Sequence, residues 1–194
     1  MKNNKPLKIY LSGPYSSKSK KKRLVNRFKI HRADISSFRI QKKFGAVISL
    51  FHVFSYLTKN STIRKTFSNA SFQLEKGGLF IFDLWYAPAV FSLKPQNKIK
   101  EIENEDLKVY RITEPKILSK MNIVEVNFKL IIINKKTKES TFVEESHNMR
   151  YFTLPEIEFL ADQSSFEVLK VEEFITGNEP SESTWGVCFI LRKK

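Results

Sequence analysis

The sequence predicts an α/β fold, and three observations support this. Phe44–Leu50 is a short, almost wholly apolar run with β-branched residues, which is typical of a strand buried on both faces. Apolar residues then recur at helical spacing between residues 58 and 74. Leu79–Leu84 is a second strand-like run. A strand, a helix and a strand within about 40 residues indicate a parallel βαβ unit.

Polar residues and glycines bound the helix of this unit. Thr58, Asn60 and Ser61 are candidate amino-terminal caps, because their side-chain oxygens can accept a hydrogen bond from the first turn. Gly77 and Gly78 are expected to end the helix, since glycine enters the left-handed conformation at no steric cost. The apolar residues at helix-compatible spacing are Ile63, Phe67, Ala70, Phe72 and Leu74.

The second half of the chain predicts an antiparallel sheet between about residues 100 and 152. Leu107–Thr113, Ile123–Asn134 and Ser140–Phe152 alternate in part between apolar and polar residues, as strands with one covered face do. The polar run N-K-K-T-K-E, which begins at Asn134, predicts a hairpin turn between the last two strands.

The carboxyl-terminal part predicts one more helix and two more strands. Thr153 is expected to begin the helix, with Pro155 in the first turn and Glu156 suited to the helix dipole. Residues 166–174 and 185–191 predict the last two strands.

The positive charge is concentrated at the amino-terminal end. The first 43 residues hold fourteen Lys and Arg against one acid, Asp34, which accounts for +13 of the formal net charge of +14. The basic run Ser16–Arg23 is compatible with nucleic acid, an anionic membrane or a nuclear-localisation-like signal. A solvated arm is the favoured interpretation, because like charges repel and the run lacks aromatic residues for base stacking. Binding to nucleic acid is therefore not expected, residues 12–27 are expected to be poorly packed, and Leu7–Leu11 is expected to add a strand to the sheet edge.

Length and composition indicate one domain in a reducing compartment. A chain of 194 residues with 41% hydrophobic residues is large enough for a substantial core. Its one cysteine, Cys188, excludes an intrachain disulfide and lies in an apolar run, so we expect a buried, inert thiol. No apolar stretch has the length of a signal peptide or a membrane span, so a cytoplasmic protein without a membrane partner is expected.

The run from Lys43 to Tyr86 resembles a known family. Its letters K-F-G-A-V-I-S-L-F-H-V-F-S-Y-L and L-E-K-G-G-L-F-I-F-D-L-W-Y are similar to the fourth and fifth strands of class I S-adenosylmethionine-dependent methyltransferases. The best match is to the subgroup acting on small molecules such as amino sugars. The likeness continues in H-N-M-R-Y-F-T from His147 and P-S-E-S-T-W-G-V from Pro180. It implies a Rossmann-like sheet, S-adenosylmethionine as cofactor and a small-molecule methyl acceptor.

The family's glycine-rich loop has no counterpart in this chain. Such methyltransferases open with a strand that ends in D/E-x-G-x-G-x-G, where the glycines let the backbone approach the cofactor. This chain has six glycines, and Gly13 alone precedes Phe44. The resemblance therefore predicts a sheet that is incomplete on its amino-terminal side. Residues 1–31 would form an atypical basic arm, and residues 32–194 the methyltransferase-like domain.

The resemblance also implies which residues contact the cofactor. Asp34 and Ile35 match the family's acidic-plus-apolar pair that contacts adenine. A turn or helix-cap aspartate is an equally good interpretation of Asp34. Ser49, Leu50 and Phe51 end the fourth strand, where the family places the methionine moiety.

Histidine and aromatic residues supply the candidates for chemistry. His52 and His147 are candidate general bases for an amine or hydroxyl acceptor, because histidine titrates near neutrality. A packed histidine satisfied by the backbone is the alternative for His52. Tyr56, Trp85 and Tyr86 are candidate substrate-binding residues that would wall a cationic or sugar acceptor, with aromatic core filling as the alternative.

No His, Cys, Asp or Glu cluster has metal-ligand spacing, so no metal is expected. Three hypotheses follow: a small-molecule methyltransferase, a non-catalytic remnant of one, and a binding protein whose basic arm takes an anionic partner.

Overall fold

The computed structural model describes residues 8–11 and 29–194. The predictions for residues 12–27 and for the basic run 16–23 lie outside the described residues. β1 (Lys8–Leu11) and β2 (Lys29–Arg32) form a two-stranded antiparallel sheet of their own. An eight-stranded sheet has the order β5-β6-β7-β8-β4-β10-β9, with β3 paired to β4. The expectation that the first strand adds to the edge of the main sheet is therefore wrong.

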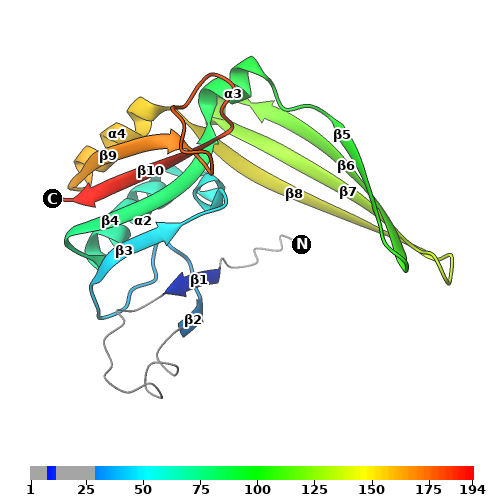
Figure 1. Ribbon diagram of the computed structural model, residues 1–194, viewed down its shortest axis with the longest axis horizontal. Coiled ribbons are helices and arrows are strands. Elements are labelled where there is room, and N and C mark those ends of the chain that lie inside the picture. The colour runs from blue at the N-terminus through cyan, green and yellow to red at the C-terminus, as the bar shows by residue number, and fades with distance from the viewer. Residues whose placement is uncertain (1–7, 12–28) are drawn as a thin grey trace.

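The other elements follow in chain order. They are β3 (Phe44–Ser49), η1 (Val53–Tyr56), α2 (Asn60–Gln73), β4 (Leu74–Tyr86), α3 (Ala87–Ser92), β5 (Lys98–Glu103), β6 (Leu107–Leu118), η2 (Ser119–Met121), β7 (Ile123–Asn134), β8 (Ser140–Phe152), α4 (Leu154–Gln163), β9 (Phe166–Glu173) and β10 (Gly186–Lys193). Figure 1 shows two parts: β3, β4, β10 and β9 lie together with α2 and α4, while β5 to β8 extend away as a long curved sheet.

The predicted βαβ unit and the predicted antiparallel insertion are both confirmed. β3 runs parallel to β4, with α2 between them in sequence, and β10 is antiparallel to both of its neighbours, β4 and β9. β5, β6, β7 and β8 form successive antiparallel pairs. The two parts join where the end of β4 pairs in parallel with the end of β8, through Trp85 with Tyr151 and Tyr86 with Phe152.

Phenylalanine fills the core between the sheet and its helices. Phe80, Phe82 and Leu84 alternate along β4 onto the covered face, as the two-residue period of a strand requires. The ring of Phe54, fully buried in η1, stacks on Phe82 with centroids 4.4 Å apart and meets Phe67 of α2 edge-on at 5.8 Å. The strands β5 to β8 form the appended sheet, and a second buried cluster lies under it. It is formed by Ala87, Val90, Val124, Val126, Met149 and Tyr151.

β3 is not buried on both faces, which corrects the prediction for residues 44–50. Only Phe44 is buried, and Ile48 is 57% exposed. Val47 packs against the main core, while Ile48 points to the opposite face. Among the described residues β3 pairs with β4 alone, so its second edge has no strand beside it. Its apolar composition fits a central parallel strand, but it stands at an edge.

The boundaries of α2 also differ from the prediction. The residue before the helix is Lys59, and it makes no side-chain cap, so the expected capping by Thr58, Asn60 or Ser61 is wrong. The helix ends at Gln73 and the chain turns directly into the extended Leu74. Gly77 is left-handed with φ of 77°, but it lies within β4 and does not end the helix.

The last helix begins as predicted. The amide of Glu156 donates to Oγ1 of Thr153 at 3.3 Å, and Pro155 lies in the first turn of α4. Ile157 and Ala161 supply the buried side of α4. No helix in the described part of the chain combines the length and the apolar character that crossing a membrane requires.

Candidate functional site

The carboxyl ends of β3 and β4 lie side by side because the two strands are parallel. His52 follows β3 and has a left-handed backbone with φ of 59°. Its amide donates to Oδ2 of Asp83 at 2.8 Å, and its ring nitrogen Nδ1 lies 2.6 Å from the same oxygen. Asp83 is fully buried on β4. The chain thus places a histidine ring against a buried carboxylate at the end of the sheet where open α/β folds bind ligands.

This contact determines the form of the His52 ring. The contact lacks the alignment of a hydrogen bond and Nδ1 has no other partner in the described part of the chain, so a carboxylate at 2.6 Å favours the tautomer in which Nδ1 carries the proton. In the neutral ring, Nε2 then carries the free lone pair, and it has no partner among the described residues. A histidine oriented in this way by a carboxylate can accept a proton from a bound nucleophile.

Two further residues hold the ring in place. The ring of Phe174 meets the ring of His52 edge-on with centroids 5.8 Å apart. A Cβ at Gly186 would lie only 2.8 Å from Cε1 of His52, so glycine is required for the approach of this ring. Sequence reasoning assigned no role to Asp83, Phe174 or Gly186. One signal was available for Asp83, the single charged residue in the apolar run L-F-I-F-D-L-W.

His147 lies on β8 and forms a second cluster with Tyr56. The hydroxyl of Tyr56 lies 3.0 Å from Nδ1 of His147, and Nε2 of His147 lies 3.5 Å from Oε2 of Glu145. Burial, and secondarily the charge of Glu145, raises the pKa of Tyr56 above its ordinary value of 10.0. The hydroxyl of Tyr56 and Nδ1 of His147 are thus within hydrogen-bond distance, and the other ring nitrogen of His147 faces Glu145. The two clusters share η1, because His52 precedes this turn and Tyr56 ends it.

Trp85 and Tyr86 are half-buried where β4 meets the appended sheet. The amide of Trp85 donates to Oγ of Ser55 at 2.8 Å, and its ring meets that of Trp185 edge-on at 5.9 Å. Tyr86 packs against the main core, and burial raises its pKa. Both rings take part in core packing, and each keeps some exposed surface.

Asp34 makes a local turn in this structure. Its Oδ1 accepts from the amide of Ser36 at 2.7 Å and from the hydroxyl of Ser36 at 2.6 Å. Ile35 packs against the main core, and its carbonyl accepts from Nδ2 of Asn69 at 2.8 Å. The turn interpretation therefore accounts for the hydrogen bonds of the Asp34 side chain. Its second oxygen, Oδ2, has no hydrogen-bond partner among the described residues.

Ser49, Leu50 and Phe51 end β3 beside His52. Phe51 is 76% exposed and has φ of 64°, and Leu50 is half-buried. Ser49 Oγ and Asp83 Oδ1 are buried without a hydrogen-bond partner in the described part of the chain. Because buried polar atoms are normally paired, these two oxygens fit polar groups of a ligand bound at this end of the sheet.

Comparison with known proteins supports the same fold. The sequence matches no family profile. One curated relative, a dTDP-3-amino-3,4,6-trideoxy-alpha-D-glucopyranose N,N-dimethyltransferase from Streptomyces venezuelae, is 31% identical over 63 residues, which is 32% of this chain and 27% of the relative.

Similar solved structures give the longer matches. An S-adenosylmethionine-dependent methyltransferase from Clostridium acetobutylicum has a TM-score of 0.69 at 17% identity, covering 84% of this chain and 63% of that one. DesVI from Streptomyces venezuelae has 0.68 at 20% identity, covering 84% and 64%. An amino pentose methyltransferase from Micromonospora echinaspora, solved with S-adenosylmethionine bound, has 0.66 at 16%, covering 84% and 63%.

The chain therefore spans less than two thirds of these solved proteins and about a quarter of the curated relative. Identities at this level establish the fold alone. The described sheet, with β3, β4, β10 and β9 in that order and β10 antiparallel, has the class I fold of S-adenosylmethionine-dependent methyltransferases.

Proposed function

We propose that this protein transfers a methyl group from S-adenosylmethionine to an amine or hydroxyl of a small molecule, with an amino sugar as the first acceptor to test. The observation that carries the proposal is the His52–Asp83 pair at the carboxyl ends of β3 and β4, within a methyltransferase fold. The curated relative is an N,N-dimethyltransferase of a dTDP-linked amino sugar, which supports this acceptor class. The bound cofactor would supply an already activated methyl group, so no metal is needed.

In this proposal His52 is the general base. Asp83 holds Nδ1, so Nε2 is free to take the proton that the acceptor nitrogen or oxygen loses. His147 is the weaker candidate, because Tyr56 and Glu145 occupy both of its ring nitrogens. The exposed surfaces of Trp85 and Tyr86 would contact the acceptor and exclude water.

The residues proposed to contact the cofactor are Asp34, Ile35, Ser49, Leu50 and Phe51. The unpaired Oγ of Ser49 would bind the methionine end, and the second carboxylate oxygen of Asp34 would bind the adenine amine. Beside the open edge of β3, the described residues contain neither a glycine-rich loop for the cofactor nor an acidic partner for its ribose. Each lost charged hydrogen bond costs about 1.5–3 kcal/mol, so two losses weaken binding roughly a hundredfold or more.

Titration calorimetry with S-adenosylmethionine is the decisive first experiment. We expect saturable but weak binding, and His52→Ala and Asp83→Asn should leave that affinity within a few-fold while methyl transfer to an amino sugar nucleotide falls at least tenfold. His147→Ala is the comparison variant, with a smaller expected loss. Unchanged turnover in His52→Ala would refute the assigned base.

A second candidate function follows from the open edge of β3. A non-catalytic remnant of a methyltransferase would keep this fold and the His52–Asp83 contact but bind no cofactor. If folded protein gave no detectable heat with millimolar S-adenosylmethionine, the non-catalytic function would be favoured.

A cytoplasmic location is part of the main proposal, and the free, buried thiol of Cys188 supports it.

A further inference from the structure

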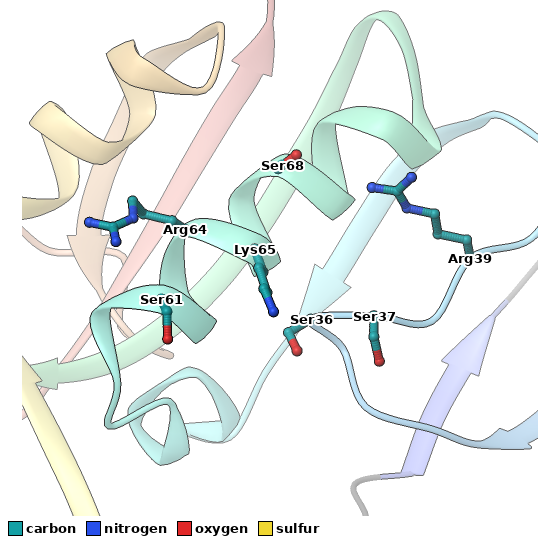
Figure 2. A pocket seen from close by; sticks show the side chains of 7 residues that line it. All are labelled: Ser36, Ser37, Arg39, Ser61, Arg64, Lys65 and Ser68. Carbon is teal, nitrogen blue, oxygen red and sulfur yellow. The ribbon is translucent and has the colours of Figure 1, made fainter.

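An open surface pocket of about 600 Å³, called the α2 cavity, lies on the outer side of α2, away from the core. Ser36, Ser37 and Arg39 line it from the loop before β3. Ser61, Arg64, Lys65 and Ser68 line it from the exposed face of α2. In Figure 2 the side chain of Lys65 points toward Ser36, across the gap between helix and loop. None of these residues belongs to the candidate methyl-transfer site.

The charge of this cavity is one-sided. Three basic side chains line it and no carboxylate does. Arg64 and Lys65 have no ion-pair partner among residues 33–194. The nearest acid along the chain, Asp34, already accepts from the amide and hydroxyl of Ser36. The first turn of α2 contains no acidic residue, so its partial positive charge is not offset either.

Arg39 is held in position for an anion. Its Nε donates to Oδ1 of Asn69 at 3.0 Å, and its guanidinium lies 4.4 Å from the centroid of the Phe72 ring. These contacts fix the group and leave its terminal nitrogens available. The hydroxyls of Ser61 and Ser68 have no hydrogen-bond partner in the described part of the chain.

We propose that this cavity binds phosphate groups, as inorganic pyrophosphate or as the diphosphate of a nucleotide. Three basic side chains, of which Arg39 is held in place, match the charge of a diphosphate, and the unpaired hydroxyls of Ser61 and Ser68 supply donors that phosphate oxygens accept. The volume exceeds that of a single phosphate, which favours the larger anion. The proposal does not depend on the methyl-transfer function.

Calorimetric titration of the full chain with pyrophosphate and, separately, with thymidine diphosphate tests this site. The variant R64Q/K65Q should weaken binding about tenfold, since each exposed charged contact contributes about 1 kcal/mol at most. The matched control K100Q/K116Q removes two exposed charges from the appended sheet and should change the Kd less than twofold. Tighter binding of thymidine diphosphate than of pyrophosphate identifies a nucleotide ligand, and equal binding identifies the phosphates alone.

Equal weakening in both double variants would overturn the site, because the attraction would then be to overall charge. Absence of saturable binding at millimolar anion would overturn it as well. Far-UV circular dichroism checks that R64Q/K65Q is folded, as expected for exposed residues.

Discussion

Arg150 joins three elements of the fold, and its removal tests how the appended sheet is held. It lies on β8 and is 8% exposed. Nη1 donates to the carbonyl of Thr58 at 3.2 Å and to Oδ1 of Asn60 at 2.6 Å, while Nη2 lies 2.7 Å from Oε1 of Glu156. The guanidinium therefore links β8 to the start of α2 and to α4.

The expected cost of Arg150→Met follows from these contacts. The methionine keeps most of the apolar stem, so the loss is chiefly three hydrogen bonds from a charged donor, each worth about 1.5–3 kcal/mol when buried. The side chain of Glu156 is 25% exposed and can rehydrate, which reduces the penalty. The substitution also removes the desolvation penalty of a buried guanidinium, so we expect a decrease in unfolding free energy of about 2–4 kcal/mol, less than the sum of the three bonds but a large part of the 5–15 kcal/mol typical of a domain.

Urea unfolding followed by far-UV circular dichroism measures this decrease. The control is Arg192→Met, an exposed residue whose Nε lies 4.0 Å from Glu167, with an expected change below about 0.5 kcal/mol. A double-mutant cycle with Glu156→Gln should give a coupling energy of about 0.5–3 kcal/mol. A change in Arg150→Met no larger than that in the control would refute the linking role.

Other predictions concern the site and the open edge. In Gly186→Ala the new Cβ, 2.8 Å from Cε1 of His52, should displace the ring from Asp83, which a changed imidazole proton shift in NMR spectra would reveal. Burial raises the pKa of the Cys188 thiol from 9.0 to about 11, which favours the neutral thiol in the fold. The stabilisation from this neutral thiol should be fully present below pH 9 and lost as the pH rises toward 11. Between pH 8 and pH 10.5, the unfolding free energy measured in urea should therefore fall more in wild type than in Cys188→Ala. Ile48→Lys should reduce concentration-dependent association in sedimentation experiments without loss of unfolding free energy.

Elements defined by local patterns could be predicted from the sequence. The strands at residues 123–134 and 140–152 have the predicted bounds, because alternation and a polar turn specify both ends. The start of α4 was predictable from Thr153 and Pro155, since capping is a property of neighbouring residues. The free, buried Cys188 followed from its apolar surroundings.

Contacts between distant residues could not be predicted in the same way. His52 reaches Asp83 because Phe51 and His52, which follow β3, adopt left-handed backbone angles, a conformation that a bulky residue such as Phe51 rarely takes. Tyr56 meets His147 across 91 positions of sequence, through the register of β8. The sequence marked these residues as candidates one by one, and only the fold shows which pairs they form.

The exposure of β3 could not be predicted from the sequence pattern either. A run of apolar residues specifies a strand with two covered faces, but the covering must come from elsewhere in the fold. Val47 has that covering from the main core, whereas Ile48 does not. The buried core lies between β4, β10 and the two helices. In the proposed function the cofactor would bind beside the open edge of β3, so the described chain would supply an oriented base and only part of the cofactor contacts.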